Sequence, residues 1–210
     1  MSDLPRPSKI VCVGRNYVAH AAEMGNEVPA EPLLFLKPPS ALIGAGEPIV
    51  LPVDAGRVEF EGEIGVRIGR RASHVEEEGA WEVVDGLLPV NDVTARELQR
   101  KDSQWSRAKG FDTFCPMGEA VPVSEVELES LAVVTRVNGE ERQRGRAEEM
   151  VFSIPFLIAY ISRIMTLEPG DLLATGTPEG VGPLRHGDIV EVELPGLATL
   201  TNPVVMGVER

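Results

Sequence analysis

A mostly β (α+β) fold in a single domain, residues 1–210, is predicted by three observations. The chain has 210 residues, a length that suits one domain. Apolar runs of roughly four to eight residues, rich in Val, Ile and Leu, recur between 21 glycines and 17 prolines, which is typical of strands separated by turns. Helical patterns are few, and no internal repeat or linker divides the chain.

Strands are expected, in chain order, in KIVCVG, LLFLK, EPIVLP, EIGVRIG, LAVVTRVNG and DIVEVELPG. The pair Asn138-Gly139, which closes the fifth run, predicts a tight hairpin turn. In the last run Glu191 and Glu193 alternate with apolar residues, so one face of that strand should be exposed.

Three segments carry helical signals. RNYVAHAAEMG should begin with Asn16 as the N-cap and end at Gly25, and the second half of VTARELQRKD is also helical. The clearest helix is in SIPFLIAYISRIMTLEPG, where Ser153 can cap the N-terminus and Pro155 falls in the first turn. Its apolar stripe is formed by Phe156, Leu157, Tyr160, Ile161 and Ile164.

The excess of acidic residues limits the partners of this protein. The chain has 33 Asp and Glu against 20 Lys and Arg, a net charge of −13. Such a surface repels phosphate backbones and anionic lipids, so no nucleic-acid or membrane partner is expected. An anionic substrate would need a local island of positive charge or a metal ion.

The sequence also favours a cytoplasmic location. The N-terminal MSDLPRPSK lacks the apolar core of a signal peptide, and the run VFSIPFLIAYI is too short to cross a bilayer. The two cysteines, Cys12 and Cys115, stand far apart in the sequence and outside any CxxC motif. They are therefore expected to be buried free thiols in a reducing compartment.

The stretch VEFEGEIGV, residues 58–66, places Glu59, Glu61 and Glu63 two apart, so on a strand their carboxylates share one face and repel. Two explanations are open: a solvent-facing acidic edge strand, or a site for a hard divalent cation. Asp92 directly follows the apolar run LLPV, at a strand end where site residues often lie, and it could complete such a site. No histidine is near these carboxylates, so Mg²⁺, Mn²⁺ or Ca²⁺ is favoured over zinc.

Two further features carry candidate chemistry. His20 and Glu23 are three residues apart and would be neighbours on a helix, either as a general base with its orienting carboxylate or as a surface ion pair. Lys109 lies among Trp, Ala, Gly and Phe residues, where it could be partly buried. LATGTPEGVG lacks the ending of a phosphate-binding loop and would instead present Thr177 and backbone N–H groups to a small ligand.

Seven stretches run in one order from about residue 9 to residue 208: CVGRNYVAHAAEMG, EPLLFLKP, FEGEIGV, NDVTARELQ, AKGFDTFCPMG, MVFSIPFLIAYISRIMTLEPGD and LATGTPEGVGP. With them the sequence resembles the fumarylacetoacetate hydrolase family, and within it the small one-domain acylpyruvate hydrolases and oxaloacetate decarboxylases. The resemblance implies a fold like the C-terminal domain of that family, a mixed β-sandwich roll with a few short helices. It also implies a homodimer.

The resemblance assigns roles to particular residues. Glu61, Glu63 and Asp92 match the metal ligands of the family, with Mg²⁺ or Mn²⁺ as the usual ion. His20 and Glu23 match a catalytic dyad on a short mobile helix. The positions that match the active-site lysine and the substrate contacts are Lys109, Arg96, Gln99 and Thr177. Glu59 matches a position that the family varies, so it should lie behind the metal ligands or be exposed.

The function implied is a Mg²⁺-dependent hydrolase that cleaves the carbon–carbon bond of acylpyruvates (2,4-dioxo acids). It should also decarboxylate oxaloacetate through a metal-bound enolate of pyruvate. His20, oriented by Glu23, would take a proton from water, and Lys109 would stabilise the oxyanion or protonate the enolate carbon. The alternative is an isomerase or decarboxylase of aromatic ring-fission products in a homoprotocatechuate-type pathway. A non-catalytic acidic binding protein is a third hypothesis, which the presence of all six metal-binding and catalytic groups disfavours.

Overall fold

The computed structural model describes residues 6–208. The first five residues, on which the expectation about a signal peptide partly rests, lie outside this range. Within it, none of the helices is long and apolar enough to span a membrane. The fold class is confirmed, because strands dominate and the helices are few and short.

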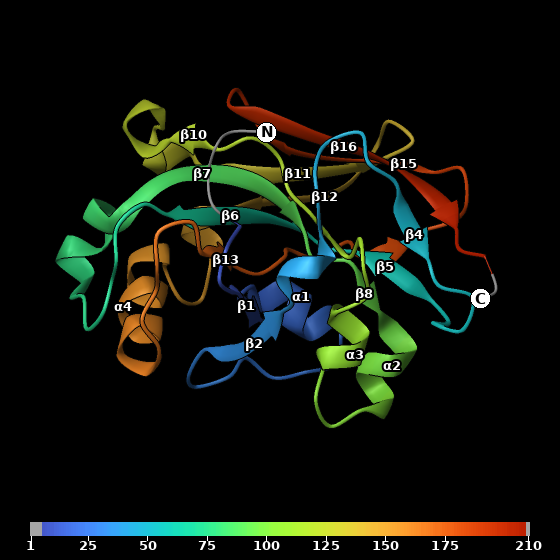
Figure 1. The fold of residues 1–210 in the computed structure, drawn as a ribbon, viewed down its shortest axis with the longest axis horizontal. Coiled ribbons are helices and arrows are strands. Elements are labelled where there is room, and N and C mark those ends of the chain that lie inside the picture. Colours follow the sequence, from blue (N-terminus) through green and yellow to red (C-terminus); the bar gives the residue numbers. More distant parts are fainter. Residues whose placement is uncertain (1–5, 209–210) are drawn as a thin grey trace.

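Two larger sheets form the body of the described chain (Figure 1). One sheet has the order β10 (Val121–Pro122), β7 (Val84–Asn91), β6 (Gly62–Ile68), β13 (Leu172–Ala174), β1 (Ile10–Gly14) and β2 (Leu33–Lys37). The other has the order β12 (Glu140–Arg146), β11 (Ala132–Val137), β15 (Ile189–Leu194), β16 (Ala198–Met206) and β4 (Ile49–Leu51). Strands β11 and β15 pack against β6 and β7, and the main apolar core lies between the sheets.

Two small sheets complete the strand content of residues 6–208. One has the order β14 (Gly182–Pro183), β5 (Val58–Phe60) and β8 (Thr94–Ala95), and the other pairs β3 (Leu42–Ile43) with β9 (Cys115–Pro116). Pairing is parallel between β1 and β13, β16 and β4, and β3 and β9, and antiparallel elsewhere.

The helices are α1 (Val18–Glu23), α2 (Arg96–Lys101), α3 (Ser106–Lys109) and α4 (Ile154–Ile164), as far as the described residues go. Short 3₁₀ turns cover η1 (Pro39–Ala41), η2 (Glu77–Val83), η3 (Val123–Glu125), η4 (Leu128–Ser130) and η5 (Ala147–Glu149). Figure 1 shows α1, α2 and α3 gathered near β2 and β8, while α4 lies apart from them and packs against η2. Helices α1, α2 and α3 surround the candidate active site described below.

Several local predictions are confirmed. Asn138 and Gly139 have φ of 54° and 79°, as a tight hairpin requires, and they join β11 to β12. Strand β15 alternates buried and less buried residues. Helix α4 is capped by Ser153, whose Oγ accepts from the N–H of Phe156 at 3.3 Å. Both cysteines are buried and free.

Two helix predictions are wrong in detail. Asn16 does not cap α1: its side chain donates to the carbonyls of Phe152 and Thr175 and accepts from the N–H of Phe152. These bonds to distant segments replace the local cap. The buried face of α4 is also rotated from the expected stripe, and Ile164 is 56% exposed.

Candidate active site

Strand register brings the three predicted metal ligands together. Antiparallel pairing of β6 with β7 sets Gly62 opposite Asn91, and the N–H of Asp92 donates to the carbonyl of Glu61 at 2.8 Å. Glu61 lies at the junction of β5 and β6, and Glu63 is the second residue of β6. The ligand atoms of Glu61, Glu63 and Asp92 all lie within 4.8 Å of one another.

The explanation by a solvent-facing edge strand is wrong. Strand β6 lies inside its sheet, between β7 and β13. Glu59, Glu61 and Glu63 are only 3%, 5% and 1% exposed. A row of buried carboxylates is costly unless cations or donors compensate it, so the neighbours of each decide what the row can do.

Two buried lysines contact the cluster. Lys109, from α3, places Nζ 2.8 Å from Glu61 Oε2 and 2.6 Å from Asp92 Oδ2, and it lies over the ring of Phe35. Burial alone would lower the pKa of Lys109, but Asp92 and Glu61 outweigh burial and raise it. Lys37, the last residue of β2, places Nζ 2.5 Å from Asp92 Oδ1.

Arg96, at the start of α2, connects two of the glutamates. Its guanidinium donates to Glu59 Oε2, Glu61 Oε1 and Gln99 Oε1, each at 2.6 Å. Burial works against ionisation of Glu61, but Lys109 and Arg96 overcome it and hold the pKa of Glu61 well below its usual range. Glu59 therefore lies behind the cluster, buried against Arg96, and is not exposed.

Of the three predicted metal ligands, Glu63 is the one that has no cation partner within residues 6–208. Its hydrogen bond comes from the N–H of Gly176, 2.7 Å from Oε2. Burial, reinforced by Asp92 and Glu61, raises the pKa of Glu63 well above its usual range.

The chemistry of the donor set fits a divalent ion. The buried carboxylates around the site are Glu59, Glu61, Glu63 and Asp92, and the buried cations are Lys37, Arg96 and Lys109. Arg57, which is more exposed, also pairs with Glu59, so the cations nearly balance the carboxylates. The all-oxygen donor set of Glu61, Glu63 and Asp92 fits a hard divalent cation.

The His20–Glu23 pair is part of the same site. His20 Nδ1 lies 3.2 Å from Glu23 Oε2, and the same carboxylate accepts from the N–H of Gly180 at 3.1 and 3.2 Å. His20 is buried and lines the cavity, so it does not form the surface ion pair that the sequence left open. With Nδ1 engaged by Glu23, Nε2 is the ring nitrogen left to act in the cavity.

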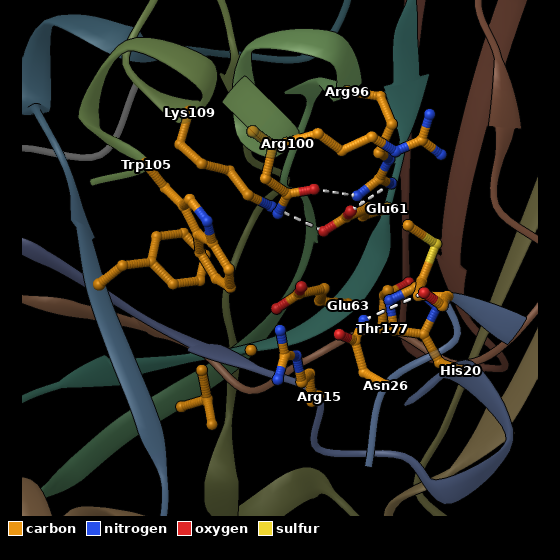
Figure 2. Close-up of a pocket in the computed structure, with 15 residues that line it drawn as sticks. Arg15, His20, Asn26, Glu61, Glu63, Arg96, Arg100, Trp105, Lys109 and Thr177 are labelled. Carbon is orange, nitrogen blue, oxygen red and sulfur yellow. Dashed lines mark hydrogen bonds and ion pairs between the residues drawn. The ribbon is translucent and has the colours of Figure 1, made fainter. Parts of the chain in front are cut away.

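A cavity of about 240 Å³ joins these groups (Figure 2). Of the predicted site residues, its lining includes His20, Glu61, Glu63, Arg96, Gln99, Lys109 and Thr177. The Thr177 hydroxyl donates to the Gly62 carbonyl and accepts from Gln143 Nε2, so it also fastens its loop to β6. Asp92 and Glu23 lie behind this lining, where they contact Lys109 and His20.

The sequence analysis missed further residues that line the cavity, namely Arg15, Asn26, Phe35, Arg100 and Trp105. Arg15 and Arg100 have no ion-pair partner within the described chain, so they give the local positive charge that an anionic substrate would need, whereas Arg96 and Lys109 are paired with the carboxylates. Arg15 adopts φ of 59°, a rare conformation for a residue with a side chain. The one signal for Arg15 was its position inside the stretch GRNY.

A buried carboxylate cluster beside a cavity lined by arginine and lysine side chains is the arrangement expected of an active site for small anionic molecules. Residues 9–205 match the profile of a family described as "Fumarylacetoacetate (FAA) hydrolase C-terminal". The chain belongs to the fumarylacetoacetate hydrolase family, and the predicted family is confirmed.

The relatives include proteins with named activities. Oxaloacetate tautomerase YisK of Bacillus subtilis is 43% identical over 214 residues, which cover 96% of this chain and 71% of the relative. The mitochondrial oxaloacetate decarboxylase of Dictyostelium discoideum is 41% identical over 197 residues, covering 91% of this chain and 90% of the relative.

Two solved structures have the same fold. A 5-carboxymethyl-2-hydroxymuconate delta-isomerase from Mycobacterium smegmatis is 48% identical with a TM-score of 0.89, over 97% of this chain and 81% of that one. Fumarylpyruvate hydrolase from Pseudomonas aeruginosa, solved with Mn²⁺ and pyruvate, is 35% identical with a TM-score of 0.91, over 98% and 93%.

Proposed function

We propose that this enzyme is a Mg²⁺- or Mn²⁺-dependent hydrolase of acylpyruvates that also decarboxylates oxaloacetate. The observation that carries the proposal is the convergence of Glu61, Glu63 and Asp92 beside a cavity that His20 and Lys109 also line. The Mn²⁺ and pyruvate in the related fumarylpyruvate hydrolase support both the ion and the substrate class.

The metal would be held by Glu61, Glu63 and Asp92. When bound, the ion supplies Lewis-acid polarisation of the 2-oxo acid and stabilises negative charge on its oxygens.

The cavity wall would bind and orient the substrate. Arg15 and Arg100 offer guanidinium groups that no described carboxylate engages, and both suit a carboxylate of the substrate. Gln99, fixed through Oε1 by Arg96, keeps its amide NH₂ group for an oxo or carboxylate oxygen. Thr177 adds a hydroxyl oxygen and a rigid loop.

His20 would act as the general base for hydrolysis. Glu23 fixes the imidazole through Nδ1, so Nε2 can take a proton from a water that attacks the distal carbonyl. The attack cleaves the carbon–carbon bond and gives a carboxylic acid and pyruvate. Lys109, a cation beside Glu61 and Asp92, would stabilise the developing oxyanion or return a proton to the pyruvate carbon.

A second function is favoured by the relatives. The solved structure at 48% identity is named as a muconate delta-isomerase and the relative at 43% as an oxaloacetate tautomerase. Isomerisation and tautomerisation of this kind move a proton without breaking a carbon–carbon bond. The same cavity could perform isomerisation of ring-fission products or tautomerisation of oxaloacetate, with His20 and Lys109 as the proton-handling groups.

The experiment is a turnover panel with purified protein. Acetylpyruvate, oxaloacetate and a ring-fission dicarboxylate are each assayed with Mg²⁺, with Mn²⁺ and with EDTA. Metal-dependent release of pyruvate from acetylpyruvate supports the proposal. Turnover confined to the isomerase or tautomerase substrates would replace it with the second function. We also propose that residues 1–210 act as one catalytic domain in a cytoplasmic homodimer, which light scattering on a sizing column tests for the oligomeric state.

A further inference from the structure

Each of the three clustered carboxylates has one oxygen already held by the protein. The contacts are Arg96 Nη2 to Glu61 Oε1 at 2.6 Å, Gly176 N to Glu63 Oε2 at 2.7 Å and Lys37 Nζ to Asp92 Oδ1 at 2.5 Å. The three donors come from different elements, namely α2, the loop after β13 and β2. Each carboxylate is thereby fixed in rotation, and the second oxygens of Glu61 and Asp92 both accept from Lys109 Nζ.

The second oxygens of Glu61 and Asp92 face a common point. Lys109 Nζ lies 2.8 Å from Glu61 Oε2 and 2.6 Å from Asp92 Oδ2, so one small cationic group can contact both. For Glu63 the free oxygen is Oε1, since Oε2 carries the bond from Gly176. A metal ion that took the place of the Lys109 ammonium group would have one oxygen from Glu61 and one from Asp92 beside it, with the Glu63 carboxylate close enough to supply a third.

Among the three donors that hold the carboxylates, Lys37 is the one to which no other role in the site has been assigned. It is 1% exposed, and it contacts Asp92 and the carbonyl of Val93 but no second acid in the described chain. It is not among the residues that line the cavity, so it does not reach the substrate. A buried lysine is costly unless it is paired, and here its pairing fixes one metal ligand.

We propose that Lys37 is a positioning residue that limits Asp92 to a single ligand oxygen and so makes the site select Mg²⁺ or Mn²⁺ over Ca²⁺. Ca²⁺ favours six to eight oxygens and often takes both oxygens of a carboxylate, whereas Mg²⁺ requires a compact octahedron and keeps several waters. Three single oxygens complete half of an octahedron and leave the rest for water and substrate. The inference rests on the proposed function, because it concerns the metal of that site.

The test measures ion preference and not turnover. Affinities for Mg²⁺ and Ca²⁺ are determined by calorimetry for the wild type, Lys37→Met and Lys37→Gln. With Lys37→Met, Asp92 can rotate and offer both oxygens, so the ratio of the Ca²⁺ Kd to the Mg²⁺ Kd should fall about tenfold or more. Lys37→Gln keeps an amide donor and should retain most of the ratio. Loss of charge alone would shift both ions equally, because both are divalent.

A matched control is Lys9→Met. It removes a lysine that lies 2.5 Å from Asp171, a partner outside the cluster, and it should leave the ratio unchanged. Equal shifts for both ions in Lys37→Met would overturn the inference.

A crystal structure of the wild type with Mn²⁺ gives an answer even where the variants do not fold. We expect one oxygen from each carboxylate on the ion and Asp92 Oδ1 still on Lys37. Asp92 bound through both oxygens would overturn the inference alone. Failure of the wild type to bind any divalent ion would overturn the proposed metal-dependent function as well.

Discussion

Replacement of His20 by Ala should separate hydrolysis from decarboxylation. A lost general base costs roughly 10²–10⁴-fold in rate, which is about 2.7–5.4 kcal/mol at 1.36 kcal/mol per tenfold. The cost to folding should be smaller. In the described structure the imidazole has one hydrogen bond, to Glu23, which keeps its bond from Gly180, and alanine suits α1. We therefore expect less than about 2 kcal/mol of lost stability, so the rate loss will not reflect unfolding.

The assay compares kcat/KM for acetylpyruvate hydrolysis and oxaloacetate decarboxylation at saturating Mg²⁺, with the metal-only decarboxylation rate subtracted. Hydrolysis should fall by roughly 10²–10⁴-fold in His20→Ala. Decarboxylation needs no attacking water, because carbon dioxide leaves unaided, so it should fall less than about tenfold. An equal loss in both reactions would refute the assignment of His20 to water activation. The thermal unfolding midpoint of the variant provides the control for folding.

Three further predictions concern the carboxylate cluster, the cavity wall and the stability of the fold. Glu63→Ala should abolish Mn²⁺ binding in a paramagnetic resonance titration together with both activities, and retention of tight binding would contradict its place among the ligands. Arg15→Met should raise the KM for oxaloacetate by roughly 10–100-fold, the value of a charge-assisted hydrogen bond, with little change in kcat; an unchanged KM would exclude Arg15 from substrate binding. The buried carboxylate of Asp171 accepts hydrogen bonds from Ser8 and Lys9, which overcome the effect of burial and lower its pKa. Asp171→Asn should therefore lose about 1–3 kcal/mol of stability at pH 7. Because the folded-state pKa of Asp171 is depressed, the stability difference between the wild type and the variant should persist above the unfolded-state pKa near 4 and shrink as the pH falls below it. A pH-independent difference in urea titrations would contradict the charge effect.

The strand pattern and the carboxylate row could be predicted because both are local. Glu61 and Glu63 can be recognised as candidate ligands by their spacing, and Asp92 by its position after an apolar run. The family resemblance implied that these three residues act together. Their convergence depends on the pairing of β6 with β7, which was not predicted.

Residues that act through distant partners were not predictable from local pattern. Lys37 ends an apolar strand like any solvated lysine, and its partner Asp92 lies 55 positions away. Asn16 has the side chain of a helix cap, but hydrogen bonds to segments after residue 150 prevail over capping. Arg15 and Arg100 resemble surface arginines until the fold places them beside the cavity.

The carboxylate of Glu23 couples the orientation of His20 to the position of the loop that contains Gly180. It bonds to His20 on its own helix and to the N–H of Gly180, 157 positions along the chain. Gly180 has φ of +96°, and a Cβ there would lie 2.0 Å from the carbonyl oxygen of Arg142, so no other residue can present that N–H in the same way. Displacement of α1 from this loop breaks the bond from Gly180 and leaves the imidazole held by a carboxylate that has lost its anchor. Replacement of the Gly180 loop alone would therefore disturb the orientation of His20, although none of the groups proposed to transfer a proton would be changed.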